Sequence, residues 1–375
     1  MKIGFNLYLR DGCISGVEYY SLAVIRALCA SFPSDCFVAF TNRPDILDNH
    51  GCRGSNLIVR KASYNNSRLF RILWEHTALP RVAEREGLDV LHSPAYICPL
   101  SACRIPYVVT VHDTIALDHP EWCTVSNAAY YALTMRRALR KAAHIVAVSN
   151  ASAAALRRQY AGDHNKITVV TSGVDDAFFG RCSTEDGRTI RGKYGLPARY
   201  ILHVGNIEPK KNIAGLLRAY SLLRKRGFEQ ALVLVGGRHW RSRSILKTIR
   251  CGEFAGSVFT PGYVDRADLP GVYQMADVYA CTSFYEGFGF PPLEAMACGV
   301  PVVSSKRGAL AEVLGDAALS IDPDKPESIA AGLVELLSDE QVRAGFVRCG
   351  TARAHYYDWK KTARELHDIY HALVA

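Results

Sequence analysis

Several signatures that would assign the chain to a common class of protein are missing from its 375 residues. The twelve cysteines are scattered singly, with no C-x-x-C pair and no His/Cys cluster at zinc spacing. Neither a zinc module nor a disulfide-stapled secreted domain is therefore predicted. No run of 18 apolar residues is available to span a membrane, and the opening MKIGFNL lacks the apolar core of a signal peptide. These absences together predict a cytoplasmic protein.

Internal repeats, low-complexity tracts and nucleic-acid-binding signatures are also absent. The formal net charge of +9 suits a nucleotide or an anionic lipid surface as well as a nucleic acid, so charge alone does not choose among them. Residues 67–85 and 135–141 are basic and amphipathic. Such faces are explained either by exposure to solvent or by peripheral contact with an anionic membrane.

What the chain does contain is an alternation of short Val- and Ile-rich runs with helical patterns from end to end. This alternation predicts parallel sheets covered by helices on both faces, the doubly wound α/β class. The expected strands are residues 2–7, 36–41, 57–61, 89–92, 107–112, 144–148, 167–170, 200–204, 231–235, 258–260, 278–281, 300–304 and 318–321. The clearest helices of the first half are residues 17–31, 67–86, 126–141 and 151–160.

The length of the chain predicts two domains of ordinary size. Residues 172–197 are rich in Gly, Asp, Arg, Thr and Ser and poor in strand pattern, so we interpret them as the connection. The predicted domains are residues 1–172 and 173–355. An amphipathic helix with apolar residues such as Trp359, Leu366 and Tyr370 is expected within 356–375.

The most informative stretch is the run E-G-F-G-F-P-P-L-E, in which Glu286 and Glu294 lie eight positions apart. Pro291 and Pro292 suit the first turn of a helix, where a missing N–H costs nothing. Backbone amides just before a helix N-terminus favour a phosphate, and here they belong to Phe288, Gly289 and Phe290. An acid one turn into the helix can accept hydrogen bonds from a ribose diol. The alternative is a capped helix with two solvated acids.

A second candidate element runs from the strand at 200–204 through Gly205 to Lys210 and Lys211, just before another helix. A cation near backbone amides at the carboxyl edge of a parallel sheet can hold a diphosphate. Taken alone, the same residues also fit a solvated turn.

These two stretches resemble the E-x7-E signature and the G-x-x-E-P-(R/K)-K-N element of the retaining glycosyltransferases of family 4. The resemblance implies a GT-B fold, with two Rossmann-like doubly wound domains facing a cleft. It further implies that the N-terminal domain binds the acceptor, that the C-terminal domain binds the nucleotide sugar, and that the last helix crosses back to the N-terminal domain. Glu286 would then face the donor sugar, Glu294 would hold the ribose, and Lys211 would bind the diphosphate. The sequence departs from the family at Asn206, where many members have a diphosphate-binding Arg that Lys210 would partly replace.

Three further positions match the family. Gly16 corresponds to a glycine that contacts the diphosphate, and Val264 lies in a loop that corresponds to the base-contact loop. His112 corresponds to a histidine beside the donor sugar, where it could donate to a hydroxyl or stabilise developing charge. The alternatives are that Gly16 is an ordinary loop glycine and that His112 has a structural role. As acceptor residues we hypothesise Asp113, His119 and Glu121, and Asp113 has the alternative of capping a turn.

The sequence thus predicts a retaining hexosyltransferase that moves mannose from GDP-mannose to a lipid-linked oligosaccharide or surface polysaccharide. No D-x-D run stands at a strand end to hold Mg²⁺, so we expect metal-independent transfer with the nucleotide sugar as co-substrate and no other cofactor. The expected location is the cytoplasm, including the inner face of the cell membrane. The alternatives are a UDP-sugar-dependent transferase, an epimerase on the same fold, and a non-catalytic partner that binds sugar nucleotides.

Overall fold

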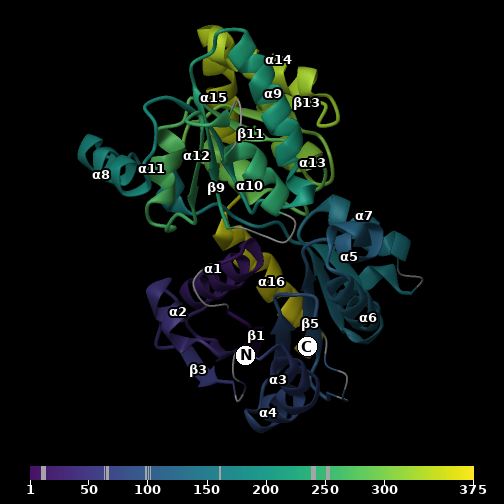
Figure 1. The fold of residues 1–375 in the computed structure, drawn as a ribbon. Coiled ribbons are helices and arrows are strands. Elements are labelled where there is room, and N and C mark those ends of the chain that lie inside the picture. The colour runs from purple at the N-terminus through teal and green to yellow at the C-terminus, as the bar shows by residue number, and fades with distance from the viewer. Residues whose placement is uncertain are drawn as a thin grey trace. The chain divides into compact units, whose positions relative to one another are not determined.

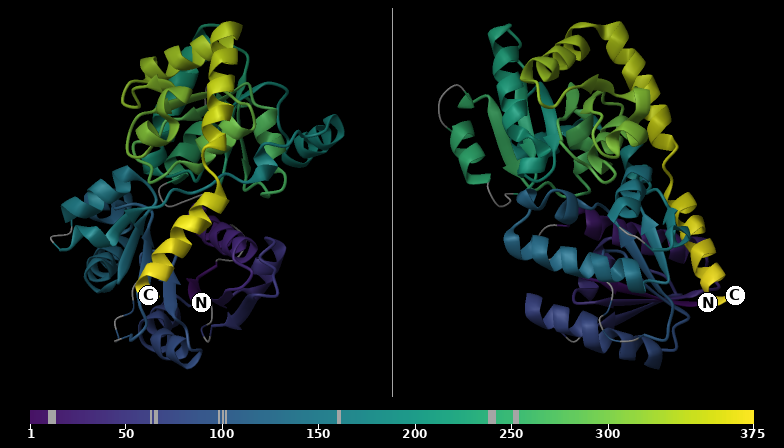
Figure 2. Two further views of the ribbon diagram at one scale, coloured as in Figure 1. Left: turned by 180° about the vertical axis from the view of Figure 1, so that it is seen from behind. Right: turned by 90° about the vertical axis from the view of Figure 1, so that its right-hand side faces the viewer.

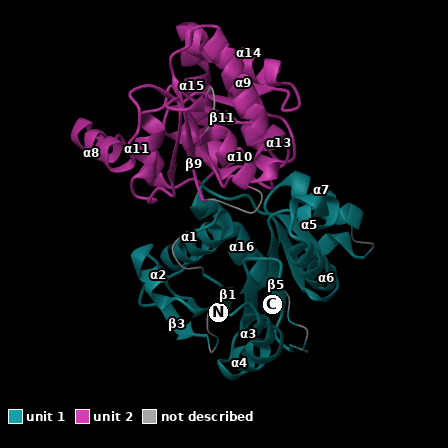
Figure 3. Cartoon of the chain, in the orientation of Figure 1, with its two compact units in different colours: residues 1–173, 358–375 teal, residues 174–357 magenta. Residues whose placement is uncertain are grey.

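The computed structural model describes residues 1–9, 14–62, 64, 67–97, 99, 101, 103–159, 162–237, 242–250 and 254–375. Within them the chain forms two compact units, coloured separately in Figure 3. Unit 1 comprises residues 1–173 and 358–375, and unit 2 comprises residues 174–357. Each unit contains one sheet whose strands are all parallel, so the predicted α/β class is confirmed (Figure 1).

The sheet of unit 1 has seven strands in the order β3-β2-β1-β4-β5-β6-β7. They are β1 (Lys2–Leu7), β2 (Cys36–Thr41), β3 (Leu57–Lys61), β4 (Val90–Ser93), β5 (Tyr107–Val111), β6 (His144–Ala147) and β7 (Ile167–Val169). The order of the strands reverses between β1 and β4. At such a switch point the connections leave in opposite directions, and open α/β sheets bind ligands beside the carboxyl ends of these two strands.

The sheet of unit 2 has six strands in the order β10-β9-β8-β11-β12-β13, so its switch point lies between β8 and β11. The strands are β8 (Tyr200–Val204), β9 (Ala231–Val235), β10 (Val258–Gly262), β11 (Val278–Cys281), β12 (Val302–Ser305) and β13 (Leu319–Ile321). All strands of both units lie within two residues of their predicted bounds.

Unit 1 contains the helices α1 (Gly16–Ser31), α2 (Pro44–Asn49), α3 (Arg68–Leu73), α4 (Leu79–Arg85), α5 (Ile115–Asp118), α6 (Val125–Lys141), α7 (Asn150–Gln159) and α16 (Trp359–Val374). Residue 160, the last residue of the helix expected at 151–160, lies outside the described residues. The single helix expected over 67–86 is instead interrupted by a π-helical turn, η1 (Trp74–Ala78). Pro80 has no N–H to donate to the carbonyl of His76, and Ser101 donates to that carbonyl from both its backbone and its hydroxyl.

Helix α16 completes the core of unit 1. The Tyr370 hydroxyl lies 2.6 Å from Nδ1 of His92 on β4, and the Trp359 ring packs against Tyr20 of α1. Figure 2 shows the two chain ends side by side in this unit. Asp35 accepts hydrogen bonds from both ends, from the Met1 amine at 2.6 Å and from His367 on α16 at 2.8 Å.

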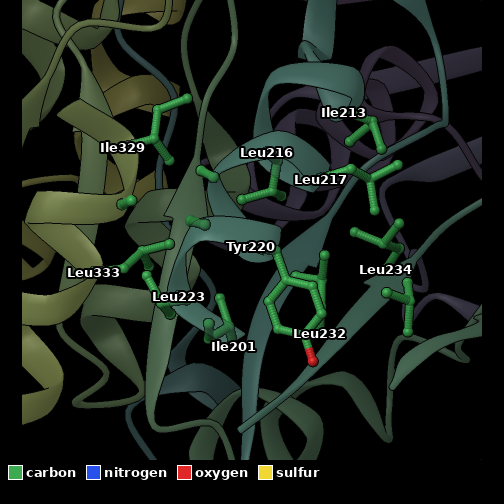
Figure 4. Packing of buried hydrophobic residues seen from close by; sticks show 14 of the residues in the cluster. Ile201, Ile213, Leu216, Leu217, Tyr220, Leu223, Leu232, Leu234, Ile329 and Leu333 are labelled. Atoms are coloured by element: carbon green, nitrogen blue, oxygen red, sulfur yellow. The ribbon is translucent and has the colours of Figure 1, made fainter. Parts of the chain in front are cut away.

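Unit 2 contains the helices α8 (Thr184–Tyr194), α9 (Ile213–Lys225), α10 (Ser242–Arg250), α11 (Leu269–Gln274), α12 (Phe290–Ala297), α13 (Leu310–Leu314), α14 (Pro326–Ser338) and α15 (Glu340–His355). Its core packs Leu216 and Tyr220 of α9 with Leu333 of α14 against the strands (Figure 4). Residues 172–197 are more than a connection, because they include α8 and belong mostly to unit 2. The pattern of α8 is weak because Ile190 is its one buried residue.

None of the helices in the described part of the chain combines the length and the apolar composition that a bilayer span requires. The nine cysteines in that part are free thiols, and Cys13, Cys98 and Cys251 lie outside the described residues.

Candidate active site

The loop that follows β8 holds Lys211 at the switch point of unit 2. It contains a 3-10 turn, η5 (Pro209–Lys211), and then Asn212, whose φ of 54° ends the turn. The Asn212 side chain caps α9 by accepting from the Gly215 amide at 3.1 Å, and it donates to the carbonyl of Pro323 at 2.7 Å. Thr282, just after β11, donates to the Lys211 carbonyl at 3.0 Å. Contacts within the loop after β8, together with the hydrogen bond from Thr282 after β11, therefore fix the position of the Lys211 backbone.

Lys211 and Glu286 form a close ion pair. The ammonium of Lys211 lies 2.6 Å from Oε1 of Glu286, and each side chain is only 12% exposed. The Ser283 hydroxyl donates to the same carboxylate oxygen at 2.6 Å. The backbone carbonyl of Glu286 is held as well, because it accepts a hydrogen bond from the amide of Ala309 at 2.9 Å. This carboxylate thus sits beside a cation at the position where the fold favours a ligand.

The surroundings keep Glu286 ionised. Burial by itself would raise the pKa of Glu286, but the charges of Lys211 and Lys210 and the hydrogen bonds from Lys211 and Ser283 lower it below its ordinary value. Lys210 also lies 3.7 Å from Glu208. Glu286 is therefore a charged carboxylate at neutral pH, held beside the Lys211 side chain.

A buried histidine lies close to this pair. Nδ1 of His203 faces the carbonyl of Ala280 at 2.9 Å, and a carbonyl only accepts, so Nδ1 carries the proton. Burial lowers the pKa of His203 to about 4, so the ring is neutral. Among the residues that the structure describes, its Nε2 has no hydrogen-bond partner, and a Cβ built on Gly205 would lie 3.5 Å from Nε2 and 3.4 Å from Cε of Lys211. Gly205 therefore leaves space beside both side chains.

Glu294 belongs to a separate network on α12. This helix begins at Phe290, after Gly289 with φ 104°, and the two prolines lie in its first turn as predicted. Oε1 of Glu294 accepts from Arg266 at 2.9 Å, and Oε2 accepts from the Tyr273 hydroxyl at 3.0 Å. Arg266 also lies 3.5 Å from Asp175.

Of the remaining predicted residues of unit 2, Phe288 and Val264 are buried. Asn206 and Lys210 are half-buried in the loop that carries Lys211. Sequence reasoning missed Ser283, His203, Arg266 and Tyr273. Two of them had a usable signal, since Ser283 lies one turn before Glu286 and Arg266 lies two residues after Val264. The pairing of Tyr273 with Glu294, across 21 positions, had none.

Two of the predicted residues of unit 1, Gly16 and His112, lie at the start of α1 and directly after β5. Gly16 is the first residue of α1, which begins with a capping box formed by Ser15 and Glu18. His112 is buried, and its Nε2 donates to the carbonyl of Pro94 at 2.8 Å. Burial lowers the pKa of His112, although Pro94 and Asp113 oppose the shift. A neutral ring with its proton on Nε2 offers an acceptor at Nδ1 rather than the donor that we expected.

The three residues hypothesised to bind the acceptor do not form one group. Asp113 accepts from the amide of Ile115 at 3.2 Å, which is the turn-capping alternative. His119 and Glu121 come together on the 3-10 turn η2 (Pro120–Trp122), with Nδ1 of His119 3.1 Å from the carboxylate. The His119 ring stacks on Trp122 at a centroid distance of 4.1 Å.

Two doubly wound units, one with a charged pair at its switch point, are the arrangement expected of the GT-B fold, and comparisons with known proteins identify the family. A family model described as glycosyl transferases group 1 matches residues 187–353. A second model, described as glycosyltransferase family 4, matches residues 14–178. The chain is 32% identical to the O-antigen chain mannosyltransferase B of Escherichia coli, covering 100% of both proteins. The chain therefore belongs to glycosyltransferase family 4.

A further relative is also a mannosyltransferase by name, and solved structures share the fold. The chain is 28% identical to the serotype-specific mannosyltransferase WbdA of Escherichia coli over 72% of its own length, and it spans 34% of WbdA. The structure of Anabaena HepE in complex with UDP and glucose matches with a TM-score of 0.76 at 20% identity, covering 99% and 100% of the two chains. Sucrose-phosphate synthase from Thermosynechococcus elongatus matches with a TM-score of 0.77 at 20% identity, covering 99% and 98%. These structural likenesses show the GT-B fold.

Proposed function

We propose that this glycosyltransferase transfers mannose from GDP-mannose, with retention of configuration and without a metal ion. The proposed acceptor is a lipid-linked oligosaccharide or a growing surface polysaccharide. The observation that carries the choice of sugar and polymer is the full-length similarity to an enzyme named O-antigen chain mannosyltransferase B. An independent support for nucleotide-sugar chemistry is the Lys211–Glu286 pair at the switch point of unit 2.

In this proposal Lys211 binds the diphosphate and stabilises the negative charge that develops on it as the bond to the sugar breaks. A preorganised ammonium in a site of low exposure is effective because it needs little reorganisation during the reaction. The amides of residues 288–290, at the start of α12, add fixed partial positive charge. Both contributions come from the chain itself, so the proposed transfer requires no metal.

Glu286 faces the donor sugar in the proposal, where its negative charge favours positive charge that develops at the anomeric carbon. The pKa of Glu286 is held below its ordinary value, which supports this electrostatic role over that of a proton donor. Glu294 accepts hydrogen bonds from the ribose, using acceptor capacity that remains beside Arg266 and Tyr273. His112 accepts from a sugar hydroxyl through Nδ1.

The first test is thermal stabilisation by GDP, UDP and ADP, without metal and then with Mg²⁺. A ligand at about 100 times its dissociation constant adds about 2.7 kcal/mol to the native state. A shift with GDP alone that is independent of Mg²⁺ supports the proposal. A shift with UDP alone would indicate that the donor is a UDP-sugar. A shift that requires Mg²⁺ contradicts metal-independent binding, and no shift with any nucleotide supports a non-catalytic role.

The second test is transfer from GDP-mannose to mannose-terminated oligosaccharides, followed by NMR of the product. An α-linked product is expected, because the donor carries an α linkage and the proposed reaction retains it. A β-linked product would contradict retention. Conversion of the nucleotide sugar without any transfer would instead point to the epimerase alternative.

We further propose that unit 1 contacts an anionic membrane at the cytoplasmic face through α3 and α6. Leu69, Phe70 and Leu73 of α3 and Val125 and Leu133 of α6 are 59–88% exposed. The two helices are neighbours, since the Arg68 guanidinium lies 5.4 Å from the Tyr130 ring centroid. Apolar side chains among basic ones are the pattern that binds such surfaces.

Co-sedimentation with vesicles that contain phosphatidylglycerol tests this contact. The Leu69→Ser/Phe70→Ser variant should bind such vesicles less than the wild type. The control is Tyr356→Ser, which removes an exposed aromatic side chain from unit 2. Equal binding by all three proteins would show that these residues are an ordinary solvated face.

A further inference from the structure

The switch point of unit 1 also carries polar side chains that the function described so far does not use. Asn6, near the carboxyl end of β1, donates to the hydroxyl of Ser93, the last residue of β4, at 3.2 Å. The same amide lies 3.4 Å from Oε1 of Glu75, which is in the π-helical turn η1. Single π turns inside helices occur frequently at functional sites. The place in the sheet and the local backbone therefore both suggest a ligand site.

Several buried polar atoms around Glu75 lack a hydrogen-bond partner within the described part of the chain. They are Oδ1 of Asn6, the hydroxyl of Tyr64, Nε of Arg71, Oε2 of Glu75 and the hydroxyl of Tyr130. Asn6, Tyr64, Arg71 and Glu75 are each at least nine-tenths buried. Nε of Arg71 and Oε2 of Glu75 face each other at 3.7 Å, which is too long for a hydrogen bond. Buried polar atoms are normally paired, so five unpaired atoms in one place call for a polar ligand or water.

Aromatic rings surround this group. The Arg71 guanidinium lies 4.2 Å from the centroid of the half-buried Tyr8 ring. The Tyr64 ring lies 6.4 Å from that of Tyr8 and 5.3 Å from that of Trp74. The cluster therefore combines flat aromatic faces with buried hydrogen-bonding atoms, the two kinds of surface that a sugar contacts.

The charges in this cluster oppose each other. When it is ionised, Glu75 offsets the charge of Arg71, and the cluster then lacks the uncompensated positive charge that would select a phosphate. Burial raises the pKa of Glu75 to about 7, against the opposing effects of Arg71 and the Asn6 hydrogen bond. Neutral, hydroxyl-rich molecules suit such surroundings better than anions.

We propose that the cluster of Asn6, Tyr8, Tyr64, Arg71, Glu75 and Tyr130 is a saccharide subsite that binds the acceptor glycan. The proposal rests on the proposed function and deepens it by naming where the acceptor sugar binds. It differs from the hypothesis for Asp113, His119 and Glu121, which lie beside β5. In the subsite, the sugar ring packs on Tyr8, and its hydroxyls bond to Tyr64, Tyr130 and Asn6. Glu75 acts as a positioning residue that orients Arg71.

The test uses the Tyr64→Phe/Tyr130→Phe variant, which removes two hydroxyls and keeps both rings. Binding of an α-linked mannose disaccharide is measured by saturation-transfer NMR without any donor. We expect at least tenfold weaker binding than in the wild type, and a similar rise of the acceptor KM with an unchanged KM for GDP-mannose. The variant should unfold at the same temperature or higher, because it loses buried hydroxyls without partners. The control is Tyr356→Phe, at an exposed position in unit 2.

The outcomes separate this proposal from the proposed function. Unchanged disaccharide binding by the Phe variant, or no binding by the wild type, would overturn the subsite whichever donor is used. If the wild type binds the disaccharide through these hydroxyls but transfers no mannose from GDP-mannose, the subsite stands and the proposed donor fails. An equal rise of donor and acceptor KM would indicate a structural role for the cluster and would also overturn the subsite.

Discussion

The Glu286→Gln substitution tests the central pair of the candidate site. The amide keeps the size of the side chain and an acceptor for Ser283, but it removes the charge that faces Lys211 at 2.6 Å. A hydrogen bond between charged groups contributes about 1.5–3 kcal/mol. For a unit of this size 1 kcal/mol corresponds to about 2–4 °C. The nucleotide-free variant should therefore unfold roughly 3–12 °C below the wild type.

A bound diphosphate changes this comparison, because it supplies negative charge to Lys211 in place of the carboxylate. GDP should therefore stabilise the variant by more degrees than it stabilises the wild type, while mannose transfer by the variant is lost. The assay is thermal unfolding with and without GDP, together with transfer from GDP-mannose. The control is Glu327→Gln, an exposed glutamate in the same unit. If the variant matched the wild type in both melting temperature and GDP response, or transferred mannose normally, our account of the pair would be wrong.

Three further predictions concern other parts of the chain. Glu294→Gln should weaken GDP binding about tenfold or more and abolish the preference for GDP over 2′,3′-dideoxy-GDP. Calorimetry can measure both affinities, and a retained preference would show that Glu294 does not bind the ribose. The folded-state pKa of Glu75, about 7, lies above its ordinary 4.5, so the wild type should lose about 3 kcal/mol relative to Glu75→Gln as the pH rises from 4.5 through 7. Urea unfolding at pH 4.5 and pH 8 checks this, and parallel stabilities would contradict it. Gly308→Ala should lower kcat at least tenfold, because φ is +60° and the new Cβ would lie 2.6 Å from the Glu286 carbonyl oxygen. Gly195→Ala, with φ +61° and no atom within 4 Å, should affect stability alone, and equal kcat losses would refute the steric argument.

The strands could be predicted because each is a short Val- and Ile-rich run, and both faces of a parallel sheet are buried. The helices were less predictable than the strands. Helix α8 buries only Ile190 and gave almost no periodic signal. The π turn before Pro80 depends on Ser101, which satisfies the carbonyl that the proline cannot. A distant partner of this kind leaves no mark on the local pattern.

The candidate site was predictable to a similar degree. Glu286, Glu294 and Lys211 could be proposed as site residues because glycines, prolines and charges gather at strand ends in recognisable order. Their partners were not, because Arg266 lies 28 positions from Glu294 in sequence and meets it only through the fold. The proton position on His112 also needed the structure, since the Pro94 carbonyl determines it.

The placement of α16 has a consequence for the order in which the protein folds during synthesis. Domains generally fold as units, and those encoded first fold first. Unit 1 departs from this order. Tyr370 and Trp359 pack in its core, and the ribosome synthesises them only after the whole of unit 2. The earlier-encoded unit is thus completed last. A truncation that removes α16 would therefore disturb the unit that begins the chain and leave unit 2 free to fold.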